Sequence, residues 1–293
     1  MKNLETSSGK ALRKPQWLRI KIPDNHGNHR VEKLLDDLNL NTVCREAKCP
    51  NRAECYSKGT ATFMILGKNC TRKCRFCNVS SAEPQCVDEK EPQRVARAVK
   101  EMGLRYVVVT SVTRDDLKDG GASHFRETIK EIKKINKDVA VEVLIPDLQG
   151  SMDSLTCVLE PLPETLNHNI ETVPRLYSEV RPEADYERSL ELLRRAKEIE
   201  GRVKTKSGIM LGLGETREEV VEVFRDLRKN NCDFLTLGQY LAPSGEHLPV
   251  KEYVRPEDFK WYREKALELG FEGVASDPLV RSSYKAWELY EGE

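Results

Sequence analysis

The chain has 293 residues, of which 33% are charged and 39% hydrophobic, a composition typical of a globular protein with a buried core. Its 48 basic residues equal its 48 acidic residues, so no overall field favours nucleic acid or an anionic membrane as a partner. No apolar run approaches the roughly 20 residues of a membrane span, and residues 1–23 lack the apolar stretch of a signal peptide. We therefore expect a cytoplasmic protein that binds neither nucleic acid nor membrane.

The predicted elements begin with one short helix over 31–40, in an N-terminal part with little periodic pattern. From about residue 60, strand-like and helix-like runs alternate. Strands are predicted over 60–66, 106–110, 139–145, 165–169, 203–211 and 234–238. Helices are predicted over 93–101, 124–135, 152–159, 186–198, 217–229 and 256–269.

This alternation predicts right-handed βαβ units and a parallel sheet in an α/β protein. Six units are too few to close an eight-fold barrel, so we expect an incomplete (β/α)6 TIM-like barrel. We expect three parts: an N-terminal cysteine-rich extension over 1–59, the partial barrel over 60–270, and a C-terminal segment over 271–293 that closes the active site. Function in such barrels gathers at the carboxyl ends of the strands.

Cysteines are the most informative residues of the chain. There are nine, and six of them lie between Cys44 and Cys77. A disulfide framework is typical of small secreted domains, so clustered cysteines in a chain of this kind point to metal. The other three, which are scattered, are expected to be ordinary small core or half-buried residues: Cys86, Cys157 and Cys232.

Cys70, Cys74 and Cys77 form a C-x3-C-x2-C triplet after the first predicted strand. Thiolates are suited to zinc or to iron–sulfur clusters. A structural zinc site has four ligands, often two C-x2-C pairs, whereas this segment has one such pair. A four-iron cluster held by three cysteines leaves one iron open to an exchangeable ligand. With Phe76 before its last cysteine, the triplet resembles the signature of the radical S-adenosylmethionine superfamily.

That resemblance implies how the open iron is used. In the superfamily, the amino and carboxylate groups of S-adenosylmethionine bind the open iron. An electron from the reduced cluster then releases a 5′-deoxyadenosyl radical, which abstracts hydrogen from an unactivated carbon. Zinc remains the alternative for these cysteines at this point.

Cys44, Cys49 and Cys55 form a second triplet, C-x4-C-x5-C. Three thiolates again suggest a four-iron cluster that lacks one nearby protein ligand. Two other readings stay open from the residues alone. Some of these cysteines can be structural, or all six can share one zinc ion and one cluster.

The two triplets and the strings around them resemble lipoyl synthases. The likeness runs from about residue 30 to the C-terminus. The matching strings are CREAKCPNRAEC (44–55), GTATFMILG (59–67), VTRDDL (112–117), DGG (119–121), HNIET (168–172), SGIMLGLGE (207–215), GQYLAPS (238–244) and RSSY (281–284).

The resemblance implies an enzyme with two four-iron clusters that inserts sulfur at C6 and C8 of an octanoyl chain attached to a lysine of a carrier protein. Each insertion uses one S-adenosylmethionine, and an auxiliary cluster donates the sulfur. Carried over to this sequence, Cys70, Cys74 and Cys77 hold the radical-generating cluster. The auxiliary cluster is held by Cys44, Cys49, Cys55 and the serine before tyrosine in RSSY, which is Ser283.

Contacts to S-adenosylmethionine are implied by a second likeness, between HNIET and the His-Asn-Leu-Asp-Thr string of biotin synthases. It assigns Asn169 and Glu171 to the ribose, and we expect Arg188 to bind the carboxylate, for which a guanidinium fork is well shaped. A plain surface charge is the alternative for Arg188. The cluster loop is basic at Lys68, Arg72, Lys73 and Arg75, a pattern that fits an acidic electron donor such as a flavodoxin or ferredoxin. A cluster-repair protein is a further expected partner.

Two rival functions are weighed against this one, and the sequence disfavours the first. A biotin synthase-like enzyme lacks the upstream triplet and the terminal RSSY string. A non-enzymatic zinc protein or electron carrier is the rival from another class, and metal content distinguishes it.

Overall fold

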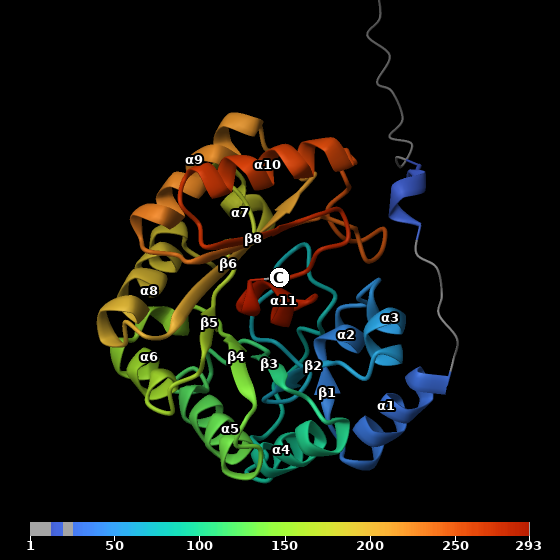
Figure 1. Cartoon of the computed structure of the whole chain (residues 1–293), viewed down its shortest axis with the longest axis vertical. Coiled ribbons are helices and arrows are strands. Elements are labelled where there is room, and N and C mark those ends of the chain that lie inside the picture. Colours follow the sequence, from blue (N-terminus) through green and yellow to red (C-terminus); the bar gives the residue numbers. More distant parts are fainter. Residues whose placement is uncertain (1–12, 20–25, 293) are drawn as a thin grey trace, which may run out of the picture.

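The computed structural model describes residues 13–19 and 26–292 (Figure 1). Its centre is one eight-stranded sheet in which the strands follow one another in sequence order. The strands are β1 (Asn41–Thr42), β2 (Thr62–Ile65), β3 (Tyr106–Ser111), β4 (Ala140–Leu144), β5 (Thr165–Asn167), β6 (Lys204–Leu211), β7 (Phe234–Gln239) and β8 (Gly273–Ser276).

Helices surround this sheet on its outer side (Figure 1). The large ones are α1 (His26–Asp37), α4 (Glu91–Met102), α5 (Ala122–Ile135), α6 (Met152–Leu159), α8 (Tyr186–Ile199), α9 (Arg217–Lys229) and α10 (Pro256–Glu268). Short ones are α2 (Val43–Glu46), α3 (Arg52–Ser57), α7 (Tyr177–Val180) and α11 (Ala286–Glu291), with 3-10 turns η1 (Gln16–Leu18), η2 (Leu148–Gly150) and η3 (Pro174–Leu176). Within the described residues, no helix has the length and apolar character that a membrane crossing requires.

Strands β2 to β8 pair in parallel, and β1 pairs antiparallel with β2. The pairing runs from β1 to β8 without joining these two end strands. The sheet is therefore an open, incomplete barrel, as the sequence predicts. The six predicted βα units are those from β2 to α10. Two strands were not predicted: β1 lies in the N-terminal extension, and β8 lies in the stretch assigned to the closing segment.

Local signals account for most helix boundaries. The hydroxyl of Thr216 and the carboxylate of Glu219 form a capping box at the start of α9. Helix α10 begins with Pro256 and is followed by Gly270, whose φ of +91° suits a residue without a side chain. The helix predicted over 31–40 instead occupies His26–Asp37. The prediction ran too far because the buried side chains of Leu38 and Leu40 continue the apolar pattern beyond the helix end.

The C-terminal segment after β8 runs back along the inner side of the sheet. Near β7, the amide of Asp277 donates to the carbonyl of Leu237. At the far end of the segment, Trp287 and Tyr290 of α11 pack on Tyr106, the first residue of β3, with ring centroids 6.3 and 5.4 Å apart. Helix α11 therefore lies at the amino ends of the strands, near the middle of the view in Figure 1.

Candidate active site

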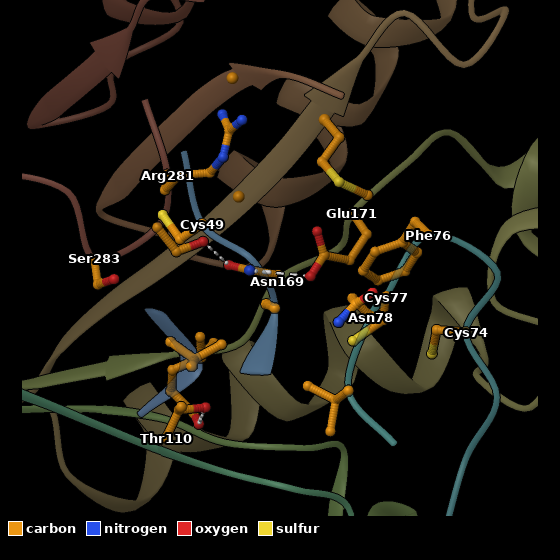
Figure 2. Close-up of a pocket in the computed structure, with 18 of the residues that line it drawn as sticks. Cys49, Cys74, Phe76, Cys77, Asn78, Thr110, Asn169, Glu171, Arg281 and Ser283 are labelled. Carbon is orange, nitrogen blue, oxygen red and sulfur yellow. Dashed lines mark hydrogen bonds between the residues drawn. The ribbon is translucent and has the colours of Figure 1, made fainter. Parts of the chain in front are cut away.

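The main cavity of the described chain, about 520 Å³, opens at the carboxyl ends of the parallel strands. Its walls carry most of the side chains singled out from the sequence (Figure 2). These are Cys44, Cys49, Cys70, Cys74, Cys77, Asn169, Glu171 and Ser283. Residues more than two hundred positions apart in the chain thus share one cavity.

A second cavity of about 240 Å³ lies on the other side of the N-terminal cysteines. Cys55 lines this cavity together with Cys44 and Cys49. Ser283 and Arg281 line both cavities, so the C-terminal segment forms a wall between them. Burial lowers the pKa of the Arg281 guanidinium, and the nearby Cys49 opposes this shift.

The C-x3-C-x2-C loop leaves β2 through two residues of left-handed backbone, Leu66 with φ +68° and Gly67 with φ +91°. Leucine rarely adopts this conformation, and here its backbone is held on both sides. The backbone amide of Leu66 donates a hydrogen bond to the buried carboxylate of Glu91 at 2.8 Å. The guanidinium of Arg114 donates to the backbone carbonyl of Leu66 at 3.3 Å. His124 contacts the same carboxylate oxygen of Glu91 at 2.8 Å. The direction in which the cysteine loop starts is therefore fixed by buried polar contacts.

Backbone hydrogen bonds fix the loop further along. The amide of Cys70 donates to the carbonyl of Ser80 at 2.7 Å, and the amide of Thr113 donates to the thiol sulfur of Cys70 at 3.3 Å. The amide of Cys77 donates to the carbonyl of Cys74 at 3.1 Å. All three cysteines line the main cavity as a result.

The C-x4-C-x5-C triplet is built on two short helices. Thr42 caps α2 by accepting the Arg45 amide at 3.3 Å, which places Cys44 in the first turn. The amide of Cys49 then donates to the carbonyl of Cys44 at 3.1 Å, closing the turn between them. Cys55 follows on α3. The turn and the two helices bring all three cysteines to the wall of the second cavity.

Four of the six thiols lie in surroundings that disfavour charge. Burial raises the pKa of Cys44 and Cys74 to about 11, and that of Cys55 and Cys77 to about 12. The thiolate form of these four groups therefore needs a cation to balance it. Soft metal ions bind thiolates and displace their protons, so two groups of three buried or half-buried cysteines fit iron–sulfur clusters by their donor chemistry.

Ser283 lies beside the N-terminal triplet. The hydroxyl of Thr62, in β2, donates to Ser283 Oγ at 2.7 Å. Two further contacts hold the same segment: the side-chain amide of Asn51 donates to the backbone carbonyl of Leu279 at 2.7 Å, and the hydroxyl of Tyr284 donates to the carboxylate of Glu54 at 3.1 Å. The residues that hold Ser283 in place thus come from β2 and from the segment that carries Cys55.

Asn169 and Glu171 follow β5 and lie next to each other in Figure 2. The Asn169 side chain donates to Glu171 Oε1 at 3.0 Å. Burial raises the pKa of Glu171, and the charge of Arg181 opposes this shift. Arg181 lines the cavity and donates to the carbonyl of Asn169 at 2.8 Å. Sequence reasoning missed Arg181, and its only signal was an arginine shortly after the HNIET string.

Arg188 is placed differently from the sequence expectation. It does not line the main cavity, and its guanidinium pairs with Asp147 at 3.3 Å. Asp147 also binds Arg72 at 2.7 Å. Burial raises the pKa of Asp147, but Arg72 outweighs this effect and the pKa falls to about 2. The side chain of Asp185 caps the start of α8 by accepting a hydrogen bond from the Arg188 backbone amide, so Arg188 lies in the first turn of that helix. From this position its guanidinium reaches the carboxylate of Asp147.

The fold and the cysteine loop together define a radical S-adenosylmethionine enzyme. Residues 64–227 match the sequence model of the Radical SAM superfamily. Methylornithine synthase has the same fold, with a TM-score of 0.57 at 16% identity over 84% of this chain and 74% of that one. HydG, a maturase of the [FeFe]-hydrogenase, has a TM-score of 0.58 at 19% identity over 72% of this chain and 50% of that one.

Closer relatives identify the family. Residues 1–49 match the N-terminal domain of lipoyl synthase, including the first 30 residues, in which sequence reasoning found no signal. The lipoyl synthase of Alkaliphilus metalliredigens is 57% identical over 95% of this chain and 96% of its own. The lipoyl synthase of Caldanaerobacter subterraneus is 58% identical over 94% of this chain and 96% of its own. The chain belongs to the lipoyl synthase family, and the expected four-iron clusters and S-adenosylmethionine are this family's cofactors.

Proposed function

We propose that this protein inserts two sulfur atoms, at C6 and C8, into an octanoyl chain carried on a lysine of a lipoyl-carrier protein. The observation that carries this proposal is one cavity at the carboxyl ends of the strands that is lined by all three cysteines of one triplet and by two of the other, Cys44 and Cys49. One group fits the generation of a radical, and the other fits a sulfur source within reach of the same substrate. We place the reaction in the cytoplasm.

In the proposed site, Cys70, Cys74 and Cys77 hold the radical-generating cluster, which supplies the electron that cleaves S-adenosylmethionine. Cys44, Cys49, Cys55 and Ser283 hold the auxiliary cluster, whose sulfide is consumed as a substrate. The protein itself contributes by holding the reacting groups in position. Tight backbone turns at both triplets fix the thiols, and the buried surroundings keep water from a reactive carbon-centred radical.

Asn169 and Glu171 contact the ribose of S-adenosylmethionine in this proposal. Their side chains line the cavity and are joined by a hydrogen bond of 3.0 Å. Arg181 is a cationic side chain that lines the same cavity, and we assign to it the role that was expected of Arg188. A guanidinium that lines the cavity beside Cys74 and Glu171 suits the carboxylate of the bound molecule.

We propose that an acidic electron donor, such as a flavodoxin or ferredoxin, docks beside the cluster loop. Lys68, Lys73 and Arg75 are exposed there, and exposed charges of one sign favour a partner of the opposite sign. Arg72 does not belong to this surface, because it is buried and paired with Asp115 and Asp147. A cluster-repair protein would act on the auxiliary site after turnover.

The function is tested by anaerobic incubation of the reconstituted protein with an octanoyl-lysine peptide, dithionite and S-adenosylmethionine. Mass spectrometry should show a peptide product with two added sulfur atoms, together with 5′-deoxyadenosine. A peptide that is unchanged while 5′-deoxyadenosine accumulates would contradict sulfur insertion. A Cys49→Ala variant is the control, because it lacks one ligand of the proposed sulfur source.

A further inference from the structure

Two consecutive serines of the C-terminal segment contact opposite parts of the site. Ser283 Oγ accepts the Thr62 hydroxyl beside the auxiliary cysteines. Ser282 Oγ donates to Asn169 Oδ1 at 2.9 Å, on the S-adenosylmethionine side of the cavity. Ser282 belongs to a different part of the chain from Asn169, 113 positions away. In the sequence, Ser282 is a residue of the RSSY string to which the resemblance assigns no role.

The contact between Ser282 and Asn169 depends on the absence of a side chain at Gly208. A Cβ atom at this position of β6 would lie 2.8 Å from Asn169 Oδ1 and 2.9 Å from Ser282 Oγ. Both distances are shorter than Cβ atoms tolerate, so any side chain would push the two groups apart. Gly208 also has an unexceptional φ, so backbone conformation does not require glycine there. The space at Gly208 is therefore occupied by this hydrogen-bonded pair.

The hydrogen bond orients the Asn169 carboxamide. An amide side chain can turn over and exchange its oxygen and nitrogen at little cost unless its partners distinguish them. Here the Glu171 carboxylate accepts from the nitrogen at 3.0 Å, and because an ionised carboxylate only accepts, it decides which end of the amide faces it. The Ser282 hydroxyl donates to the oxygen at the other end at 2.9 Å and holds the amide plane in place. One N–H and one lone pair of the amide remain for the hydroxyl groups of a ligand. Figure 2 shows the contact between Asn169 and Glu171 as a dashed line.

We propose that Ser282 is a positioning residue for S-adenosylmethionine, which acts by holding the Asn169 carboxamide in its binding orientation. This inference rests on the proposed function, in which Asn169 contacts the ribose. The same short segment then serves both halves of the site, with Ser282 on the cofactor side and Ser283 on the auxiliary side. The resemblance assigned a role to Ser283 of these two serines, and this inference adds one for Ser282.

The test is a double-mutant cycle on S-adenosylmethionine affinity, measured anaerobically by calorimetry on protein with both clusters loaded. Ser282→Ala should weaken binding about fivefold to tenfold, the effect of losing one orienting hydrogen bond. In the Asn169→Ala background, the same change should have less than a twofold effect, because the group that Ser282 orients is gone. Iron and sulfide content should stay as in the unaltered protein. Ser276→Ala is the matched control, because Ser276 donates to the carbonyl of Phe259 and does not line the cavity.

Four outcomes distinguish the possibilities. Weakening by Ser282→Ala that disappears in the Asn169→Ala background supports the inference. If Asn169→Ala weakens binding but Ser282→Ala stays within twofold, the inference is overturned and the proposed function stands. If Asn169→Ala has no effect on affinity, the proposed cofactor contact fails, and the inference fails with it. Equal weakening by Ser282→Ala in both backgrounds would assign Ser282 to packing and would also overturn the inference.

Discussion

Thr62 donates a hydrogen bond to Ser283 over 2.7 Å, although the two residues are 221 positions apart in the chain. Thr62 is fixed by strand pairing, opposite Val108 of β3. A hydrogen bond from the Thr62 backbone lowers the pKa of the Cys44 thiol, against the larger effect of burial. Thr62 therefore contacts a cysteine of the N-terminal triplet through its backbone and, through its hydroxyl, the serine proposed to complete the ligand set.

The first prediction concerns Ser283. Ser283→Ala should retain the radical-generating cluster and the cleavage of S-adenosylmethionine but lose most of the lipoyl product, because the auxiliary site loses a ligand. Ser283→Cys should bind the cluster firmly and turn over poorly, since a thiolate leaves a soft metal less readily than an oxygen ligand does. Both are measured as product and 5′-deoxyadenosine per chain by mass spectrometry. Near-normal product from Ser283→Ala would remove this serine from the ligand set.

The second prediction concerns metal content. Anaerobically reconstituted protein should hold about eight irons and eight sulfides per chain, as two four-iron clusters. Colorimetric iron and sulfide analysis with Mössbauer spectroscopy measures both. Protein that reaches full activity at about four irons would contradict the two-cluster site, and colourless protein with bound zinc would favour the alternative metal.

The third prediction separates the two cysteine triplets. Cys74→Ala should abolish reductive cleavage of S-adenosylmethionine, because the radical-generating cluster loses a ligand. Cys49→Ala should still produce 5′-deoxyadenosine but no sulfur-containing product. Iron content of each variant, expected at about four per chain, shows that the other cluster is intact. If both variants fail to cleave S-adenosylmethionine, although each still holds its other cluster, the two triplets do not have these separate functions.

The fourth prediction compares the two arginines near the HNIET string. Arg181→Gln should weaken S-adenosylmethionine binding, because Arg181 lines the cavity and donates to the Asn169 carbonyl. Arg188→Gln should leave the affinity within about twofold of that of the unaltered protein. Arg188 pairs with Asp147 outside the cavity wall, and the Arg188 side chain is partly exposed to solvent. Calorimetric titration measures both. If Arg188→Gln weakens binding more than Arg181→Gln does, Arg188 and not Arg181 binds the carboxylate of S-adenosylmethionine.

The fifth prediction concerns stability. Lys206 of β6 and Glu142 of β4 form a buried ion pair at 3.0 Å, with 1% and 0% of their side chains exposed. Tyr106 and Asn167 donate to the same carboxylate at 2.7 and 3.0 Å. Lys206→Met should lower the free energy of unfolding by about 3–5 kcal/mol, because it leaves a buried carboxylate without its cation. Lys204→Met is the control: Lys204 is on the same strand, and its pair with Glu272 is exposed and worth at most about 1 kcal/mol. Chemical denaturation checks both, and equal losses would contradict the buried-charge explanation.

The sequence by itself determined the six βα units and the two cysteine triplets. Each of these is a local pattern. Apolar periodicity within a strand or helix depends on neighbours a few residues away, and the spacing of a cysteine triplet lies within a single loop. Asn169 and Glu171, which are close together in one string, were assigned by the resemblance of that string to the one in biotin synthases. The structure brings these side chains to one cavity wall, and their roles as ligands stay predictions.

Only the tertiary structure decided which distant groups meet. Arg181 and Arg188 have similar sequence signals, but one lines the cavity and the other meets Asp147. The short strands β1 and β8 were missed because runs of two and four residues carry too little periodicity to be distinguished from loops. The contacts of Ser282 and Ser283 arise because the C-terminal segment returns along the inner side of an open sheet. Curvature of that sheet sets such long-range contacts, and no pattern within the segment encodes them.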